Sequence, residues 1–228
     1  MVIRLKDVIY KIPNGHVVYE NLNFELELGE FIGVLGKNGA GKTTLLDLLM
    51  GYRPITTGEI EVLSEDPMSL SRRRKKDIFV LSHDIQIQSS HSVRNYLDFT
   101  SFFYENYDKD KEQELLEYFG INADVKMGSL STGQKVKAQI VAAMSAKPKL
   151  YLMDEVTAVL DPESRKQFFV LLKKLHAQKD CSLIMATNIA EDINGVVDKV
   201  LFIDHKHADV HEVSEIEHLF NLDVEEAA

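Results

Sequence analysis

The sequence contains a single cysteine and no long apolar run, and both absences exclude broad classes of protein. One cysteine, Cys181, cannot form a disulfide within the chain. It lies in an apolar stretch, which predicts a buried thiol. No stretch of about 18 uninterrupted apolar residues occurs, so we expect no membrane-spanning helix. The first residues, MVIRLKDV, also lack the apolar stretch of a signal peptide, and we expect a cytoplasmic protein.

Basic residues are also in deficit. The chain carries 26 lysines and arginines against 36 aspartates and glutamates, for a formal net charge of −10. Binding to the phosphate backbone of nucleic acids requires clustered positive charge, so we expect no nucleic-acid partner. One run of basic residues, Arg72 to Lys76, is interpreted as a solvated surface, with phosphate or lipid contact as the alternative.

Short apolar segments alternate with helical patterns, and this alternation predicts an α/β protein with a mostly parallel core sheet. Two segments near the start, 2–5 and 17–28, flank a turn and predict a small antiparallel subdomain. The other predicted strands are 31–35, 59–63, 78–81, 150–153, 182–186 and 200–203, and the predicted helices follow the glycine loop and cover 133–146 and 163–178.

The composition changes near His83, and residues 92–119 are helical in pattern and rich in aromatic side chains. Five of these side chains are expected to share one helix face: Val93, Tyr96, Leu97, Phe99 and Phe103. We expect a single domain, 1–228, with a core of 1–83 and 148–228 and an inserted helical subdomain of about 84–147.

A glycine-rich segment, GKNGAGKTT, fits the phosphate-binding pattern G-x-x-x-x-G-K-[ST]. An apolar strand precedes it, and a leucine-rich helix that stops at Gly51 follows it. Glycines let backbone N–H groups surround phosphate oxygens, and a helix N-terminus favours an anion. The flanking elements disfavour the alternative, a glycine-rich turn without a ligand. The expected nucleotide-binding residues are Gly36, Lys37, Asn38, Gly39, Ala40, Gly41, Lys42, Thr43 and Thr44, with Lys42 on the terminal phosphates and the Thr43 hydroxyl on Mg²⁺.

Three further motifs follow this loop. Residues 130–134 read LSTGQ, the strand KLYLMDE ends in Asp154 and Glu155, and residues 157–162 read TAVLDP. In this order and at this spacing the four motifs resemble those of ABC transporter ATP-binding subunits, whose signature is LSGGQ, with Thr132 replacing one glycine. The resemblance covers nearly the whole chain and implies an ATPase that uses ATP and Mg²⁺.

The resemblance also implies residue roles. Asp154 would hold Mg²⁺ and Glu155 would activate the attacking water as a general base, which an acidic pair at the end of a buried strand can do. Asp161 would be the D-loop aspartate. The active unit would be a head-to-tail dimer, with itself or with a second ABC ATPase, in which the signature contacts the ATP of the opposing subunit. The signature residues are Ser131, Thr132, Gly133 and Gln134; without the resemblance they are an ordinary helix cap.

Three places depart from the family pattern. His83 takes the position of a glutamine that contacts the metal, with Gln86 and Gln88 just beyond it. Asn188 takes the position of a switch histidine with a catalytic role. The aromatic residue that stacks on adenine is replaced by Ile12, with Tyr10 two positions earlier. These departures bear on the rate of hydrolysis and on the adenine contact, and they leave the phosphate loop intact.

The function implied is that of a subunit, peripheral on the cytoplasmic face of the membrane, that powers a transporter whose integral membrane permease subunits are separate chains. The LSTGQ variant is more similar to subunits of ABC-2-type exporters than to importers. One alternative is a soluble ABC-type ATPase not tied to transport. Another is a regulatory subunit that binds ATP and hydrolyses it poorly. A histidine-rich tract, with His205, His207 and His211, is interpreted as a polar turn after a strand, with a metal site as the alternative.

Overall fold

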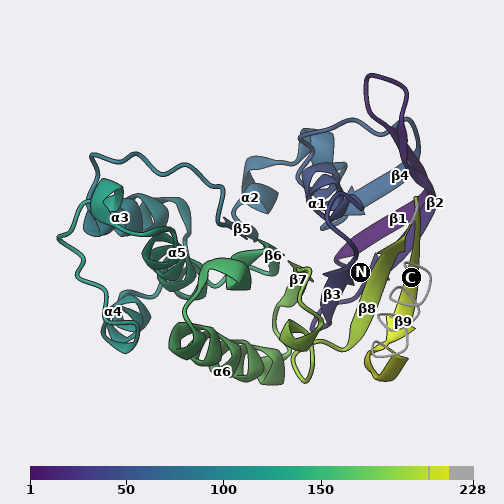
Figure 1. The fold of residues 1–228 in the computed structure, drawn as a ribbon. Coiled ribbons are helices and arrows are strands. Elements are labelled where there is room, and N and C mark those ends of the chain that lie inside the picture. Colours follow the sequence, from purple (N-terminus) through teal and green to yellow (C-terminus); the bar gives the residue numbers. More distant parts are fainter. Residues whose placement is uncertain (205, 216–228) are drawn as a thin grey trace.

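The computed structural model describes residues 1–204 and 206–215, which form two β-sheets and the helices around them (Figure 1). The larger sheet has six strands, in the order β5 (Ile78–Ser82), β6 (Leu150–Asp154), β7 (Ser182–Ala186), β3 (Phe31–Leu35), β8 (Lys199–Asp204) and β9 (His207–Glu212). The first five strands are parallel to their neighbours, and β9 runs antiparallel to β8. The mostly parallel core sheet predicted from the sequence is confirmed.

The last strand of this sheet corrects one interpretation. The histidine-rich tract does not stop at a polar turn after β8, because it continues as β9, paired with β8 from Lys199–Glu212 to Asp204–His207. Its side chains are mostly exposed, since β9 is an edge strand. An edge strand needs fewer apolar residues than a central one, and this is why the tract lacked a strand pattern.

The smaller sheet is antiparallel, as predicted. Its strands lie in the order β2 (Val17–Leu26), β1 (Ile3–Lys11) and β4 (Thr57–Val62). Alternate residues of β1 and β2 are buried, which is the pattern expected where one face of a sheet packs on a core. In Figure 1 this sheet lies beside α1 (Lys42–Leu49), the helix that follows the glycine loop.

The remaining helices are α2 (Arg72–Lys75), α3 (Val93–Phe103), α4 (Lys109–Tyr118), α5 (Thr132–Ala146) and α6 (Pro162–Gln178), and short 3₁₀ turns are η1 (Pro67–Ser69), η2 (Met127–Ser129), η3 (Val156–Val159), η4 (Ala190–Asp192) and η5 (Val213–Glu215). The group α3, α4 and α5 is inserted between β5 and β6 and lies on one side of the molecule (Figure 1). The exact division at residues 84 and 147 stays a proposal. Within the described residues, no helix is both long enough and apolar enough to cross a membrane.

The face predicted for α3 is partly wrong. Val93 and Leu97 are buried, but Phe99 is 72% exposed. Successive residues of an α-helix turn by about 100°, so a residue two positions after Leu97 points to nearly the opposite side. Thr100 takes the buried position instead, and its hydroxyl donates to the Tyr96 carbonyl.

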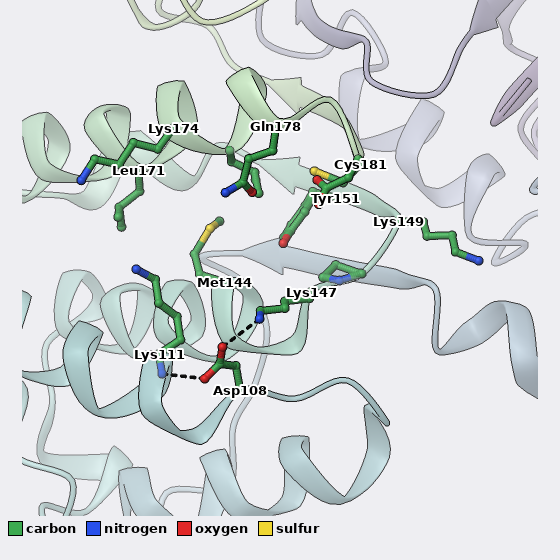
Figure 2. Close-up of a pocket in the computed structure, with 13 residues that line it drawn as sticks. Asp108, Lys111, Met144, Lys147, Lys149, Tyr151, Leu171, Lys174, Gln178 and Cys181 are labelled. Carbon is green, nitrogen blue, oxygen red and sulfur yellow. Dashed lines mark hydrogen bonds and ion pairs between the residues drawn. The ribbon is translucent and has the colours of Figure 1, made fainter.

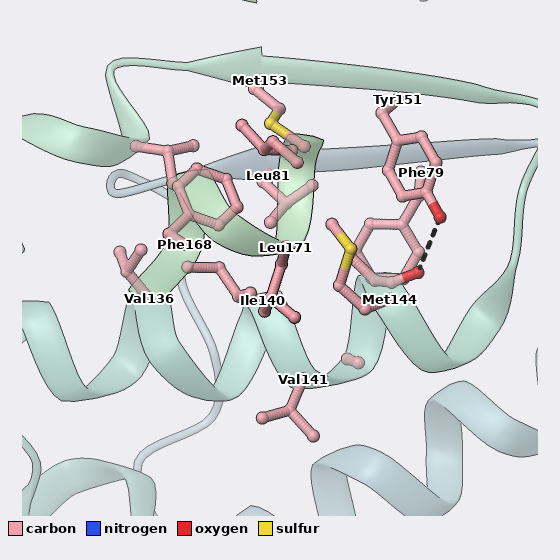
Figure 3. Packing of buried hydrophobic residues seen from close by; sticks show 14 of the residues in the cluster. Phe79, Leu81, Val136, Ile140, Val141, Met144, Tyr151, Met153, Phe168 and Leu171 are labelled. Atoms are coloured by element: carbon pink, nitrogen blue, oxygen red, sulfur yellow. Dashed lines mark hydrogen bonds between the residues drawn. The ribbon is translucent and has the colours of Figure 1, made fainter. Parts of the chain in front are cut away.

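Two apolar cores lie on the two faces of the large sheet. One core joins α5 and α6 to the sheet, with Ile140, Phe168 and Met153 in contact across the layer (Figure 3). The other joins α1 and the antiparallel sheet to the opposite face. Burial on both faces explains why β3 and β7 are continuous apolar runs.

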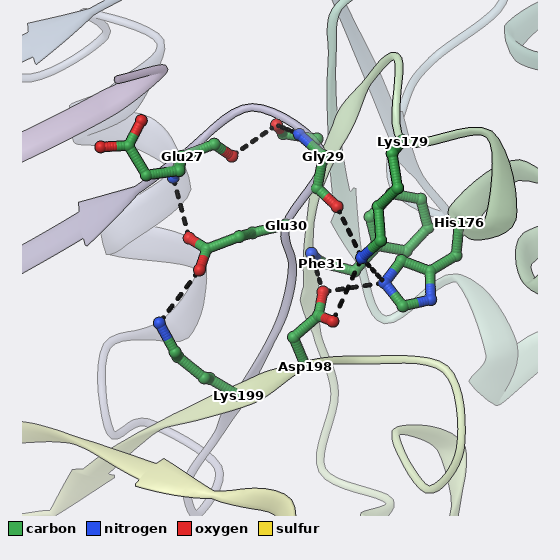
Figure 4. Close-up of polar contacts among 9 residues, drawn as sticks. Glu27, Gly29, Glu30, Phe31, His176, Lys179, Asp198 and Lys199 are labelled. Atoms are coloured by element: carbon green, nitrogen blue, oxygen red, sulfur yellow. Dashed lines mark hydrogen bonds and ion pairs between the residues drawn. The ribbon is translucent and has the colours of Figure 1, made fainter.

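The beginning of the central strand β3 is held by ionic side chains (Figure 4). The Asp198 carboxylate accepts a hydrogen bond from the Phe31 N–H at 2.8 Å and lies 2.8 Å from His176 Nε2. Burial alone would raise the pKa of Asp198, but these contacts, with Lys179, hold it below its ordinary value. These contacts anchor the first residue of β3, the strand whose other end leads into the glycine loop.

We predict that Phe168→Ala lowers the free energy of unfolding by about 3–5 kcal/mol, because this ring is fully buried between α6 and the sheet. Phe102→Ala is the matched control, since that side chain is 91% exposed and its loss should change stability by less than about 0.5 kcal/mol. Urea unfolding followed by circular dichroism measures both. Equal losses would contradict the assignment of Phe168 to the core.

Candidate functional site

The glycine loop leaves the carboxyl end of β3 and enters α1 at Lys42. Gly41 has a φ of +116°, which only glycine adopts readily. Gly36 lacks a side chain for a different reason, because a Cβ there would lie 2.7 Å from the Ile203 carbonyl oxygen. The backbone of the loop is thus fixed by the ends of two strands before any ligand binds.

The Lys42 ammonium is buried and folded back over its own loop. Its Nζ donates to the carbonyl oxygens of Gly36, at 2.8 Å, and Lys37, at 3.2 Å. Burial lowers the pKa of Lys42, and the nearby carboxylates of Glu155 and Asp154 act against this effect. A cation held in this position can exchange the two carbonyls for phosphate oxygens, as a phosphate-binding loop requires.

A hydroxyl and a carboxylate meet beside the loop. Thr43 Oγ1 donates to Asp154 Oδ2 at 2.8 Å, and the other carboxylate oxygen, Oδ1, is buried with no hydrogen-bond partner. Burial raises the pKa of Asp154, and the Thr43 hydrogen bond opposes this rise. Mg²⁺ prefers oxygen ligands and one or two carboxylates beside phosphates. The orphaned oxygen beside a hydroxyl fits that cation.

Glu155 follows Asp154 at the end of β6 with a φ of +48°, a left-handed conformation that is strained for a residue with a side chain. Its N–H donates to the Ala186 carbonyl at 2.9 Å, which holds this turn against the end of β7. Glu155 directly follows Asp154, whose carboxylate accepts from the Thr43 hydroxyl beside the loop. A base at this position fits activation of water beside a phosphate.

Two of the three departures from the family pattern, His83 and Asn188, lie at the same edge of the sheet. Asn188 Nδ2 donates to Asn38 Oδ1 in the glycine loop at 3.3 Å. His83 directly follows β5, where Ser82 is paired with Asp154. Its Nδ1 is buried without a partner, and its Nε2 lies 3.3 Å from Asp84 Oδ1. The structure therefore brings Asn188 to the phosphate loop and His83 to the strand end beside Asp154, while their roles stay predictions.

The structure separates the two residues expected at the adenine. Tyr10 is 4% exposed, and its hydroxyl oxygen accepts from Arg53 Nη1 at 3.4 Å. A ring packed in the core is not available to stack on a base, because the inward alternation of β1 buries it. Ile12 is half-buried beside the same core and is the one of the pair that a base could reach.

The signature segment begins α5. Ser131 caps the helix, and its hydroxyl and the Gln134 side chain satisfy each other's backbone N–H groups. Thr132 is exposed, and a Cβ on Gly133 would lie 2.6 Å from the Val159 carbonyl oxygen. The glycine therefore allows the helix start to approach η3 closely. Ser131 is exposed, so the same cap is accessible to a second chain.

Asp161 caps α6 and links it to α5. Its carboxylate accepts from the Ser164 N–H at 2.9 Å and the Ser164 hydroxyl at 2.7 Å, and it pairs with Lys137 Nζ at 3.0 Å. Hydrogen bonds from Ser164, then the Lys137 ammonium, hold the pKa of Asp161 well below its ordinary value. The predicted D-loop aspartate is thus a fixed anion that joins the signature helix to the segment after Glu155.

Sequence reasoning missed Tyr19. This fully buried side chain comes from β2, and its hydroxyl donates to the Gly41 carbonyl at 2.8 Å. The same carbonyl accepts from the Leu45 N–H. Together they orient the peptide between Gly41 and Lys42, whose N–H belongs to the loop. Only the alternating pattern of β2 signals that Tyr19 is buried, and nothing in the sequence indicates its partner.

Sequence reasoning also missed Asp192, a carboxylate that is 1% exposed. It accepts hydrogen bonds from Thr157, from Thr187 at 3.2 Å and from Arg165 Nε at 2.8 Å. Thr187 precedes Asn188, and Thr157 lies two residues after Glu155. One buried anion thereby holds together the two turns that carry these polar side chains.

A pocket of about 600 Å³ lies elsewhere, between α4, α6 and the beginnings of β6 and β7 (Figure 2). Its rim includes Lys147, which is paired with Asp108 at 2.8 Å, and its floor includes Tyr151 and Met144. Ligands of open parallel sheets bind at the carboxyl ends of the strands, and this pocket is at the amino ends. It is separate from the phosphate loop.

The histidine tract gives no metal centre in the part of the chain that is described. His205 lies outside the described residues, and His211 Nδ1 lies 3.1 Å from Glu215 Oε2. His207 begins β9. Among the described residues, no three histidine, cysteine, aspartate or glutamate side chains converge as metal ligands.

Comparison with known proteins consistently finds ABC transporter proteins and their ATP-binding subunits. The family described as ABC transporter matches residues 19–158. The methionine import ATP-binding protein MetN of Clostridium tetani is 30% identical over 230 residues, covering 96% of this chain and 70% of the relative. The Nod factor export ATP-binding protein I of Rhizobium sp. (strain N33) is 33% identical, covering 83% of this chain and 64% of the relative. The chain spans 58% of the length of two further MetN relatives.

The fold agrees with a solved structure at low sequence identity. A dimeric ATP-binding cassette in a post-hydrolysis state, bound to ADP and Pi, has a TM-score of 0.81 at 20% identity. The match covers 92% of this chain and 98% of that chain.

We predict that Tyr19→Phe weakens binding of a non-hydrolysable Mg·ATP analogue by up to about tenfold and lowers stability by about 1 kcal/mol, because one hydrogen bond to the loop is lost. Tyr151→Phe is the control, since Tyr151 is also buried and donates to a backbone carbonyl, that of Ala143, away from the loop. Calorimetric titration measures affinity. If both variants bound equally to the parent, Tyr19 would have only a packing role.

Proposed function

The chain belongs to the ABC transporter family, and from this membership we propose that it powers a membrane transporter by binding and hydrolysing ATP. The chain is an ATPase that uses ATP and Mg²⁺. The observation that carries the proposal is the meeting of a buried ammonium, a hydroxyl and a partly unpartnered carboxylate at one strand edge, contributed by Lys42, Thr43 and Asp154.

The proposed roles follow from the chemistry of each group. Lys42 exchanges its loop carbonyls for oxygens of the terminal phosphates, and the N–H groups of the loop bind the rest. Thr43 and Asp154 hold Mg²⁺, which when bound neutralises phosphate charge. Glu155 orients the attacking water and accepts its proton. The Asn188 amide donates one hydrogen bond toward the phosphates but carries no proton, so hydrolysis by the isolated chain is slow.

The signature is proposed to act across a dimer. The exposed cap at Ser131 presents backbone N–H groups at the start of α5, and such groups suit a γ-phosphate. Since the cap lies on the inserted helices and the loop lies on the core, a head-to-tail pair of chains would enclose two ATP molecules. The partner is a second copy or a related ABC ATPase.

We predict that Glu155→Gln slows hydrolysis by about 10²–10⁴-fold, because the amide keeps the shape of the side chain but accepts no proton. ATP then persists, and light scattering with Mg·ATP should detect dimers where the parent chain is mainly monomeric. Lys42→Ala in the same background is the control, since it removes the phosphate contact and should remain monomeric. A variant that hydrolysed ATP at the parent rate would contradict the role of Glu155.

A groove at the C-terminal end of α1 favours transport over a soluble ATPase. It has a volume of about 680 Å³ and lies between the end of α1, η1, β5 and α3. Five of its side chains are large, apolar and exposed, and the three most exposed are Tyr52 at 70%, Met68 at 54% and Phe99 at 72%. Contiguous exposed apolar side chains indicate a protein contact. We propose that a short cytoplasmic segment of the permease chain binds here, which places this subunit on the cytoplasmic membrane face.

The direction of transport is proposed as export, on the similarity of LSTGQ to exporter subunits. A regulatory subunit with weak hydrolysis is the second candidate, and Asn188 beside the loop favours it. Steady-state hydrolysis with and without the permease distinguishes the two candidates, since only a working motor is stimulated to sustained turnover.

We predict that Phe99→Asp abolishes association with membrane vesicles that contain the permease partner, because a carboxylate in the groove would be desolvated. Phe102→Asp on the same helix is the matched control, since Phe102 is 91% exposed and does not line the groove. Vesicle sedimentation measures association, and ATP affinity should be unchanged in both. Equal binding of the two variants would exclude this groove.

A further inference from the structure

Two buried polar atoms without partners lie at the same edge of the large sheet. One is Asp154 Oδ1 at the end of β6, and the other is His83 Nδ1, immediately after β5. The strands are adjacent, with Ser82 paired to Asp154. Buried polar groups are nearly always hydrogen-bonded, so two unpartnered atoms on adjacent strand ends call for a shared ligand.

The contact between His83 and Asp84 indicates which nitrogen of the His83 ring carries the proton. Nε2 lies 3.3 Å from Asp84 Oδ1, and a carboxylate can only accept. The proton is therefore assigned to Nε2, and Nδ1 has a free lone pair. A carboxylate on one ring nitrogen and a free lone pair on the other form the arrangement that metal-ligating histidines adopt. The free nitrogen is the buried one.

A cation at this edge cannot be held by the protein alone. Within the described residues no three histidine, cysteine, aspartate or glutamate side chains converge as metal ligands. The remaining ligands would come from the Thr43 hydroxyl, oxygens of the bound nucleotide and water. Cation binding through His83 is therefore expected only in the presence of nucleotide.

We propose that His83 contributes an imidazole nitrogen ligand to the cation of the nucleotide complex and shifts the preference of this site from Mg²⁺ toward first-row transition cations, from Mn²⁺ to Co²⁺. The inference rests on the proposed ATP site. Mg²⁺ selects oxygen ligands, whereas imidazole nitrogen binds transition cations with an affinity that rises from Mn²⁺ to Co²⁺. An amide side chain at this position offers an oxygen, so the histidine is the residue that changes the preference.

The first measurement is the affinity of a non-hydrolysable ATP analogue with Mg²⁺ and with Co²⁺, in the full chain and in His83→Gln. The substitution should weaken Co²⁺-dependent binding by about 10–100-fold and change Mg²⁺-dependent binding much less, because an oxygen ligand replaces the nitrogen. His91→Gln is the matched control, since His91 is an exposed histidine eight positions along. An unchanged ratio of the Co²⁺ and Mg²⁺ affinities in His83→Gln would overturn the proposal.

The second measurement detects the ligand atom directly. With Mn²⁺ and the analogue bound, electron spin echo spectra should contain a coupling to nitrogen that changes when the chain is labelled with [¹⁵N]histidine. The coupling should persist in His91→Gln and disappear in His83→Gln. Analogue binding with Mn²⁺ but no histidine coupling would overturn the proposal and leave the ATP site intact. A chain that bound no analogue with any cation would contradict the ATP site itself.

Discussion

The in-register pairing of parallel strands is the constraint on which the rest of the molecule depends. Asp154 is paired with Ser82 on one side and with Ala186 on the other, so β5, β6 and β7 end at the same level. Every side chain that follows one of these strands is then brought to one edge, beside the loop that follows β3. Residues more than a hundred positions apart meet there without any long loop. A slip of one residue in any of these strands would turn alternate side chains away from the site.

Much of this arrangement could be predicted from the sequence, because parallel strands buried on both faces are continuous apolar runs and the polar residues after them stand out. The phosphate loop and the acidic pair were identified in this way, whereas His83 and Asn188 were placed by the resemblance to ABC transporter ATP-binding subunits. The failures have different causes. The strand β9 was missed because an edge strand carries no apolar run, and Phe99 was placed on the wrong face of α3 because a wide aromatic set fits more than one helix face.

The supporting contacts could not be predicted, because they depend on which surfaces of distant elements meet. Tyr19 reaches the loop from the antiparallel sheet, and Asp192 joins two turns through threonine hydroxyls. Neither belongs to a motif. Tyr10 is a residue that the sequence placed at the adenine and that packing removes from it. Nothing in the sequence near this position indicates that its ring is buried in the core. The groups that react can be recognised by type and spacing, whereas the groups that hold them are defined by packing.

The carbonyl oxygens of Gly36 and Lys37 compete with any phosphate ligand for the ammonium of Lys42. This ammonium already has two carbonyl oxygens as acceptors, so a ligand gains only the difference between its own hydrogen bonds and those that it displaces. A single inorganic phosphate makes few contacts besides the one with Lys42, so it gains little free energy from displacing the two carbonyl oxygens. A triphosphate binds the loop amides and the lysine together and gains more. The two carbonyl acceptors of Lys42 therefore favour ligands that also bind the loop amides over ligands that bind the ammonium alone.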